Sequence, residues 1–362
     1  MSVEFIGYIG THHSSEIHPY DGPAIDRDYV ETVARAHEDG GFDRALVAFG
    51  STSPESQLVV AHAASVTRRL QFMIAHRPGF TAPTVAARQL ATLDQFTGGR
   101  VAVHIITGGS DAELRKDGDH LTKDERYART DEYLDIVRQE WTSEQPFDYT
   151  GRFYQVQGAF GGVKPAQQPH IPIYFGGSSD AAIPVAGKHA DIYALWGETQ
   201  AQVRETIARV RAAAARHGRR VRFSLSLRPV LAETEEAAWR RADEIAERAR
   251  AVREAAGLPT SGHAPPNAGS QRLLEAAASG TRLDKRLWTG VAAVTGAAGN
   301  STGLVGAPEQ VADALLDYYD LGVSTFLIRG FDPLDDAIAY GRDLIPLVRQ
   351  RVEGRPQAFA AE

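Results

Sequence analysis

The amino-acid sequence predicts an α/β protein, and among α/β folds a (β/α)8 TIM barrel with insertions. Three observations support this prediction: short strand-like runs alternate with longer amphipathic segments, eight such pairs can be counted, and no GxGxxG follows the first strand. Strands separated by helices pair in parallel, and eight such units close into a barrel. An open doubly wound sheet is the main alternative, but it would normally carry that glycine motif.

The eight predicted strands are short and mainly apolar. In chain order they are Val3–Gly10, Ala45–Phe49, Leu70–Ala75, Val101–Ile106, Ile171–Phe175, Ile192–Trp196, Val221–Leu231 and Thr325–Ile328. The predicted helices carry apolar residues on one face, as Val30, Val33 and Ala34 do in the first. In chain order they are Arg27–Asp39, Glu55–Arg68, Ala82–Phe96, Asp124–Trp141, Ser179–His189, Gln200–His217, Thr234–Arg253, Pro308–Tyr319 and Leu334–Val352.

Two segments do not fit the repeat, so we expect one barrel domain over residues 1–362 with two insertions. Residues 147–162 (FDYTGRFYQVQGAFGG) predict a small β excursion. Residues 257–303 are rich in Ala, Gly, Pro and Ser, and Gly290–Gly303 has the composition of a mobile loop. Such a loop can be a functional lid or a slack linker, and composition alone favours neither.

Composition narrows the functional class. With 43% hydrophobic and 23% charged residues, the chain is typical of a globular protein that buries a large core. A formal net charge of −7 argues against a nucleic-acid partner. The lack of cysteine excludes disulfides, thiolate nucleophiles and zinc–thiolate sites. No signal peptide or membrane-spanning stretch is predicted, so a cytoplasmic enzyme is the expectation.

Candidate functional residues follow the predicted strands, because the active site of such a barrel lies at the carboxyl ends of its strands. These residues are His12, His13, Ser51–Ser53, His76, Arg77, His104, Thr107, Gly176–Ser179, Trp196–Glu198, Arg228 and Arg329–Asp332. Arginine binds oxyanions through several donors, so Arg77, Arg228 and Arg329 predict an anionic substrate. One or more of them could instead pair with a carboxylate at the same strand ends. His12 is a candidate proton donor or acceptor.

The turn after the fifth strand, YFGGSSDAA, has two interpretations. Gly176 and Gly177 permit close backbone approach, and Ser178 and Ser179 precede a predicted helix. Hydroxyls and a helix N-terminus suit a phosphate, whereas a plain serine N-cap is the alternative. No metal site is predicted, because the twelve histidines show no HExxH spacing and adjacent His12 and His13 point in different directions.

Several longer segments carry a resemblance to a known family. They are PTVAARQLATLDQFTGGR (83–100), IITGGSDAEL (105–114), DERYARTDEY (124–133), IPIYFGGSSDAA (171–182), ALWGE (194–198) and LWTGVAAVTGAAGNSTGLVG (287–306). In this order and at these separations they resemble the flavin-dependent two-component monooxygenases of the bacterial-luciferase-like superfamily, most closely the alkanesulfonate monooxygenases. The resemblance covers nearly the whole chain.

The resemblance implies a barrel that binds reduced FMN (FMNH2) supplied by a separate NAD(P)H-dependent flavin reductase. It implies O2 as cosubstrate and oxidative C–S cleavage of a small organosulfonate to an aldehyde and sulfite. Superfamily members commonly form homodimers or homotetramers, so one of these assemblies is expected.

The resemblance also implies roles for residues at matching positions. Tyr127, Ser178 and Ser179, with Gly177 in the same turn, correspond to ligands of the flavin phosphate and ribityl chain. His104 and Thr107 correspond to contacts with the flavin edge. Trp196 lines the substrate side, and Gly290–Gly303 corresponds to a lid over the flavin.

The substrate positions depart from the alkanesulfonate pattern. Ser53 replaces a cysteine, Ser226-Leu227-Arg228 replaces Arg-x-His, and Thr295 replaces an arginine in the lid. Phe331 and Pro333 stand where the pattern has tyrosine and histidine. We therefore expect a retained flavin site and a rebuilt substrate site that uses Arg228, Arg77, Arg329 and Phe331. The alternatives are a different substrate, such as a sulfone, ketone or amine, or an F420-dependent oxidoreductase.

Overall fold

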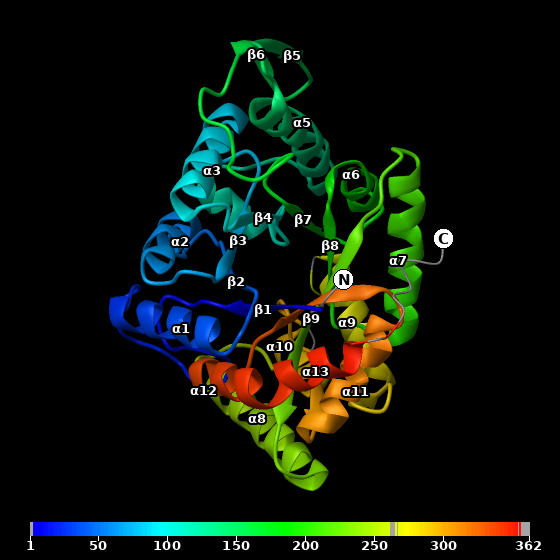
Figure 1. Cartoon of the computed structure of the whole chain (residues 1–362). Helices are drawn as coiled ribbons and strands as arrows, with labels where there is room; N and C mark the ends of the chain where they lie inside the picture. Colours follow the sequence, from blue (N-terminus) through cyan, green and yellow to red (C-terminus); the bar gives the residue numbers. More distant parts are fainter. Residues whose placement is uncertain (1–2, 261–264, 266, 354, 356–362) are drawn as a thin grey trace. The chain divides into compact units, whose positions relative to one another are not determined.

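A computed structural model describes residues 3–260, 265, 267–353 and 355. Its eight parallel barrel strands are β1 (Glu4–Tyr8), β2 (Arg44–Val47), β3 (Gln71–His76), β4 (Val101–Ile105), β7 (Ile173–Gly176), β8 (Ile192–Trp196), β9 (Arg222–Leu231) and β13 (Val323–Ile328) (Figure 1). They are hydrogen-bonded in the order β9-β13-β1-β2-β3-β4-β7-β8, and β8 also pairs with β9. This ring confirms the predicted (β/α)8 barrel.

Helices follow the strands as predicted. They are α1 (Arg27–Asp39), α2 (Ser56–Ser65), α3 (Pro83–Thr97), α5 (Lys123–Thr142), α6 (Ala182–His189), α7 (Gln200–Ala215), α8 (Glu235–Ala255), α11 (Pro308–Tyr319), α12 (Pro333–Ala339) and α13 (Ile345–Val352). The last predicted helix is interrupted by a π-helical turn, η2 (Tyr340–Leu344). Pro346 at the start of α13 has no N–H to donate to that turn, which accounts for the interruption.

The chain folds into two compact units. Unit 1 consists of Met1–Ala45, Ala194–Arg209 and Arg222–Glu362, and unit 2 consists of Leu46–Tyr193 and Val210–Val221. The predicted cofactor residues His104, Thr107, Tyr127 and Gly177–Ser179 lie in unit 2, together with Arg77. The other predicted substrate and catalytic residues lie in unit 1.

Unit 2 adds small elements to its strands and helices. The short helix α4 (Asp111–Leu114) and the 3-10 turn η1 (Arg115–Asp117) precede α5. Residues 147–162 contain an antiparallel hairpin of β5 (Phe147–Thr150) and β6 (Gln155–Ala159), which follows α5 in Figure 1. The TGGR segment (97–100) has a structural role, because Arg100 donates hydrogen bonds to the Leu70 and Ala64 carbonyls at 2.9 and 3.0 Å.

Unit 1 contains a folded insertion between α8 and α11. It consists of α9 (Ala268–Ser279), β10 (Arg282–Leu283), β11 (Leu287–Trp288), α10 (Gly290–Thr295) and β12 (Gly303–Gly306). Strand β12 runs parallel to β9, with Gly303 opposite Arg228. The small residues of the insertion allow close packing, since a Cβ on Gly290 would lie 2.5 Å from the Trp288 indole nitrogen. The segment that composition assigned to a lid or a linker thus has secondary structure in its described residues.

The core of unit 1 joins this insertion to its neighbours. Buried residues of α8, α10 and the β13–α12 turn form one apolar cluster, which includes Trp239, Ile245, Trp288, Val291 and Phe331. Among the described residues, no helix has the length and apolarity that crossing a bilayer requires.

Candidate functional site

The turn after β7, residues 177–181, meets the side chain of Tyr127. Gly177 has φ +131°, a conformation that favours glycine. A Cβ at this position would lie 2.5 Å from the Tyr127 hydroxyl oxygen. The Tyr193 hydroxyl also donates a hydrogen bond to the Gly177 carbonyl. The fold therefore brings Tyr127 and Gly177 together.

Two serine hydroxyls in this turn are buried without a hydrogen-bond partner among the described residues, those of Ser178 and Ser179. The sequence left open a serine N-cap on a helix starting at Ser179, but α6 starts at Ala182 and its N-cap is Ala181. The backbone N–H groups of Ala182 and Ile183 donate to the Ser179 carbonyl at 2.9 and 3.2 Å. The hydroxyls are therefore the available donors in the turn. Because unpaired buried hydroxyls cost free energy, the turn fits a ligand with oxygen acceptors, such as a phosphate.

His104 offers a second unpaired group in unit 2. It lies in β4 opposite Tyr174 of β7. Its Nδ1 is buried and has no hydrogen-bond partner in the described part of the chain. Burial lowers the pKa of His104 to about 4, so the ring is neutral at pH 7. Thr107 is buried just beyond the same strand. A neutral imidazole and a hydroxyl can form hydrogen bonds with a ligand whose edge carries both donors and acceptors.

His76 and Arg77, by contrast, already have protein partners. A ring nitrogen of His76 lies 2.7 Å from the Tyr133 hydroxyl, and burial lowers the pKa of His76 to about 4. Arg77 is buried, forms a 3.0 Å ion pair with Glu113 and lies over the Phe49 ring at 5.1 Å. The charge of Arg77 is therefore balanced within unit 2.

Arg228 is the most enclosed of the predicted substrate residues, with a relative exposure of 0%. Its Nη1 lies 2.7 Å from a carboxylate oxygen of Glu16, and its Nη2 donates to the Gly330 carbonyl at 2.8 Å. Arg329 donates to the other Glu16 oxygen at 3.0 Å. Burial by itself would raise the pKa of Glu16. The positive charges of Arg228 and Arg329 outweigh burial and lower the pKa to about 2. Glu16 is therefore ionised and lies between the two arginines.

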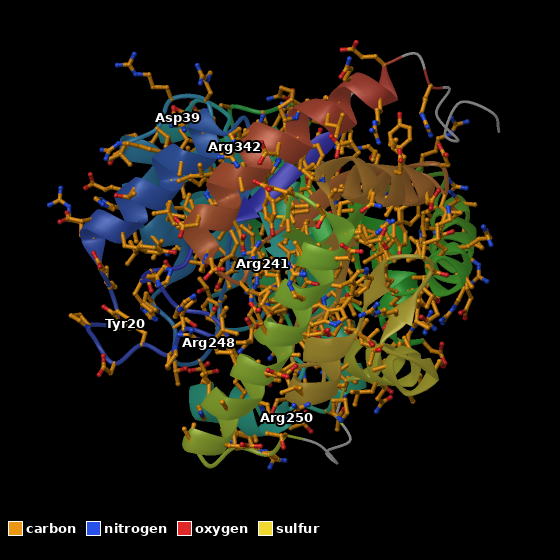
Figure 2. The ribbon with its side chains drawn as sticks, turned by 90° about the horizontal axis from the view of Figure 1, so that it is seen from below. Tyr20, Asp39, Arg241, Arg248, Arg250 and Arg342 are labelled. Atoms are coloured by element: carbon orange, nitrogen blue, oxygen red, sulfur yellow. The ribbon has the colours of Figure 1, made fainter. Side chains whose placement is uncertain are left out.

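Phe331 fixes the guanidinium of Arg228 from one face. The ring centre lies 3.5 Å from the Arg228 Cζ atom. The Phe331 and Asp332 N–H groups donate to Asp336 at 2.9 and 3.0 Å, and Arg241 of α8 donates to Asp336 at 2.7 Å (Figure 2). These contacts hold the turn after β13 in one conformation.

His12 and Trp196 have different surroundings within unit 1. A ring nitrogen of His12 lies 3.2 Å from the Ala24 carbonyl oxygen, and the ring stacks on Tyr20 at 4.1 Å. Trp196 packs against the insertion, where a Cβ on Gly269 would lie 2.9 Å from its ring. Neighbouring Glu198 is buried and accepts two bonds near 2.9 Å from Arg272 of α9. The end of β8 is thus tied to the insertion.

Comparison with protein families identifies the family to which the chain belongs. The model of one family, described as luciferase-like monooxygenase, matches residues 3–325. The chain belongs to the luciferase-like monooxygenase family. The expected superfamily is therefore confirmed, whereas the match does not distinguish alkanesulfonate monooxygenases from other members.

Solved structures show the same fold as this chain. A riboflavin lyase (RcaE), in a structure with modified FMN and riboflavin, is 20% identical with a TM-score of 0.80; the match covers 97% of this chain and 92% of that one. The EDTA monooxygenase EmoA from Chelativorans sp. BNC1 is 20% identical with a TM-score of 0.77, covering 100% and 96%. DmoA from Hyphomicrobium sulfonivorans is 21% identical with a TM-score of 0.77, covering 99% and 90%.

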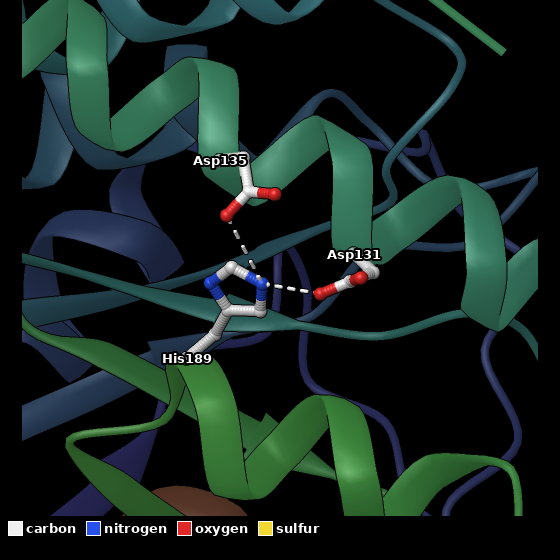
Figure 3. A group of neighbouring side chains, drawn as sticks. All are labelled: Asp131, Asp135 and His189. Carbon is white, nitrogen blue, oxygen red and sulfur yellow. Dashed lines mark hydrogen bonds and ion pairs between the residues drawn. The ribbon is translucent and has the colours of Figure 1, made fainter. Parts of the chain in front are cut away.

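The chain also contains a polar cluster that the sequence did not predict. Asp131 and Asp135 of α5 meet His189 of α6, whose ring nitrogen lies 2.7 and 3.8 Å from the two carboxylates (Figure 3). These atoms are close enough to hold a metal ion. However, the Lys188 ammonium already lies 2.9 and 2.8 Å from the same two carboxylates. The cluster therefore acts as an ion-pair network that joins α5 to α6.

Glu16 is the other residue that sequence reasoning missed. It follows β1 and the two histidines that were singled out, so its place near a strand end was an available signal. Its pairing with Arg228 and Arg329, more than 200 positions away, leaves no local pattern in the sequence.

Proposed function

We propose that this chain is the oxygenase component of a two-component flavin-dependent monooxygenase. It binds reduced FMN from a separate NAD(P)H-dependent flavin reductase and uses O2 to oxygenate a small organic molecule. The observation that carries this proposal is the pair of buried, unpaired hydroxyls of Ser178 and Ser179 beside Gly177. The modified FMN of the similar riboflavin lyase and the activity named for EmoA support it.

The cofactor residues of unit 2 have distinct tasks in this proposal. Ser178, Ser179 and Tyr127 hold the phosphate and ribityl chain, because hydroxyls donate strongly to charged oxygens. His104 and Thr107 contact the edge of the flavin ring, where a neutral imidazole adds no charge. When bound, reduced FMN supplies the electrons that activate O2.

Residues of unit 1 handle the substrate in this proposal. Trp196 and the described part of the insertion, from α9 to β12, exclude water as a lid does. His12 donates or accepts a proton. Arg228, Arg329 and Phe331 set the charge and shape that the substrate meets. The side chain of Arg329 is 28% exposed, so it is the more accessible of the two arginines paired with Glu16.

An organosulfonate is the substrate class that we place first, because the arginines favour an anion. The reaction consumes RCH2SO3−, O2 and FMNH2. It forms an aldehyde, sulfite, water, FMN and one proton. One oxygen atom enters the carbon that loses sulfur, and the C–S bond electrons leave with sulfite. We also propose that the chain assembles as a homodimer or homotetramer.

A neutral substrate with the same flavin chemistry is the second candidate. One specific observation favours it: Glu16 already neutralises part of the charge of Arg228 and Arg329. A sulfone, a ketone or an amine would then be oxygenated without an anion to bind.

Anaerobic titration and turnover together test the proposal. Reduced FMN should bind stoichiometrically, and a mixture with flavin reductase, NAD(P)H and an alkanesulfonate panel should release sulfite. Flavin binding with background sulfite, but with substrate-dependent O2 uptake on sulfones, ketones or amines, would select the second candidate. Binding of reduced F420 in place of FMNH2 would contradict the monooxygenase proposal.

A further inference from the structure

Glu16, Arg228 and Arg329 form a charged cluster, in which Arg228 lies in one strand, Arg329 directly follows a second and Glu16 lies in the loop after a third. The strands are β1, β9 and β13, which are neighbours in the sheet, and all three residues belong to unit 1. Two guanidinium groups face one carboxylate, at 2.7 Å from Arg228 and 3.0 Å from Arg329. The cluster therefore keeps an excess positive charge. A cavity of about 20 Å³, enough for one water molecule, adjoins both arginines and is lined also by Tyr8, Ser14 and Ser15.

The guanidinium of Arg228 is held in place without Glu16. The Gly330 carbonyl accepts its Nη2 at 2.8 Å, and the Phe331 ring covers its face at 3.5 Å. Asp336 and Arg241 hold the turn that carries Gly330 and Phe331. An added Cβ on Gly330 would lie 2.0 Å from an Asp336 oxygen, so this turn depends on glycine. The cation is thus preorganised for an anion.

The ion pair between Glu16 and Arg228 has poorer hydrogen-bond geometry than its short distance suggests. The 2.7 Å contact with Arg228 is an ion pair, but neither that Glu16 oxygen nor Nη1 of Arg228 has a hydrogen-bond partner among the described residues. Nε of Arg228 and Nε of Arg329 also lack partners there. Three guanidinium nitrogens around one carboxylate therefore have unused hydrogen-bonding capacity. An oxyanion with more oxygens could satisfy more of them.

The main chain on both sides of Glu16 is anchored. Ser15 donates to the Phe331 carbonyl at 2.6 Å, and Arg248 of α8 donates to the Ile17 carbonyl at 3.0 Å. Figure 2 labels Arg248 on α8 and Tyr20 in the loop that contains Glu16. Rotation of the Glu16 side chain would therefore vacate the space between the arginines while the loop stays in place.

We infer that Arg228 and Arg329 form an oxyanion-binding site and that Glu16 is its internal occupant, which competes with an external sulfonate, sulfate or carboxylate. Glu16 is thereby a specificity-determining residue that weakens the binding of anions at these strand ends. The binding competition follows from the contacts alone. Its consequence for substrate choice, a higher KM for anionic substrates, rests on the proposed function.

Anion binding to two variants tests this inference without flavin, reductase or turnover. Glu16→Gln keeps the shape of the side chain and removes its charge, and Glu16→Ala also removes its bulk. Inorganic sulfate is titrated at constant ionic strength, and binding is followed by calorimetry and by the melting temperature. We expect sulfate to bind Glu16→Gln at least tenfold more tightly than wild type. Glu16→Ala should melt lower than wild type and recover saturably with sulfate, because it leaves the buried Arg228 and the partly exposed Arg329 without their carboxylate.

Glu31→Ala is the matched control. Glu31 also lies between two arginines, Arg27 and Arg35, both at 3.0 Å, but these arginine side chains are 76% and 52% exposed, whereas Arg228 is buried. This variant should show the sulfate response of wild type, which separates specific binding from a general salt effect. Glu16→Gln combined with Arg228→Met should lose the gained affinity. Equal sulfate affinity of wild type and Glu16→Gln would overturn the inference, whether or not the chain proves to be a monooxygenase.

Discussion

The polar residues at the strand ends are of two kinds, which their partners distinguish. Arg77 and Arg228 are buried beside carboxylates, which offset part or all of their charge within the protein. Ser178, Ser179 and Nδ1 of His104 are buried with no hydrogen-bond partner in the described part of the chain. Native structures rarely leave such atoms unpaired. The second kind of residue therefore marks the place where a ligand fits.

Replacing both Ser178 and Ser179 with alanine should weaken FMNH2 binding selectively. Each hydrogen bond to a charged group contributes about 1.5–3 kcal/mol, so losing two predicts about a 100-fold rise in Kd or more. Anaerobic fluorescence titration measures this change. Ser65→Ala is the control, since the Ser65 hydroxyl is exposed and bonds the His62 carbonyl at 2.7 Å. An unchanged Kd in the double variant would place the flavin phosphate elsewhere.

His37 should make the protein less stable at mildly acidic pH. Its Nδ1 bonds the Val33 carbonyl at 2.7 Å, and its Nε2 accepts the Tyr8 N–H at 3.2 Å, so the ring must be neutral. Burial lowers the pKa of His37 from 6.5 to about 4. Between these values the unfolded chain binds more protons than the folded one, so stability falls as the pH drops from about 6.5 towards 4.

The effect of His37 should reach about 2 kcal/mol at pH 5. Urea unfolding at pH 7 and pH 5 measures it, and His37→Gln should reduce the pH dependence by about this amount even if it lowers stability at both values, while His76 and His104 keep their own contributions. His217→Gln, at an exposed position, should keep the wild-type dependence. A His37→Gln protein with the wild-type pH dependence would show that other groups cause the acid sensitivity.

At the scale of elements, local periodicity predicted the barrel strands and helices because alternation and amphipathicity are local properties. It missed features that depend on distant partners. Helix α6 starts at Ala182 because the Ser179 carbonyl caps its first N–H groups, which a Ser-Ser pattern does not indicate. Residues 290–303 look like a loop by composition, yet α10 and β12 form because they pack on α8 and pair with β9. The residues proposed for the flavin site come from sequence motifs, whereas the Glu16–Arg228 pair leaves no local pattern.

Helix α9 depends on one ion pair at the end of β8. Arg272 of α9 contacts Glu198 at 2.9 Å, and the two side chains are 18% and 6% exposed. Burial raises the pKa of Glu198, and the Arg272 charge opposes that rise. Arg272→Met would leave the carboxylate buried without its cation and should destabilise the protein by about 3 kcal/mol. Hydrogen exchange should show faster exchange at the amides of α9.

Arg342→Ala is the matched control for Arg272→Met. Arg342 pairs with Asp343 at 2.7 Å, but its side chain is 70% exposed and the pair is solvated (Figure 2). Its removal should leave both the unfolding midpoint and the exchange of α9 nearly unchanged. If Arg272→Met leaves the exchange of α9 at the wild-type rate, packing against Trp196 and α10 holds the helix instead.

At the scale of the whole molecule, the proposed cofactor site would link the stability of the fold to flavin binding. The folded chain presents the Ser178 and Ser179 hydroxyls in one turn, and an unfolded chain cannot. A ligand that binds only the folded state adds RT ln(1 + [L]/Kd) to the free energy of unfolding. The proposed function therefore makes a prediction about stability that needs no substrate.

Saturation with FMNH2 under anaerobic conditions should raise the melting temperature of the intact protein. At 100 times Kd the gain is about 2.7 kcal/mol, which for a chain of 362 residues is a shift of several degrees. Differential scanning fluorimetry without oxygen measures it, and the Ser178→Ala/Ser179→Ala variant should lose most of the shift at the same FMNH2 concentration. Reduced F420 and inorganic phosphate are the comparison ligands. A larger shift with F420 than with FMNH2 would reverse the cofactor assignment.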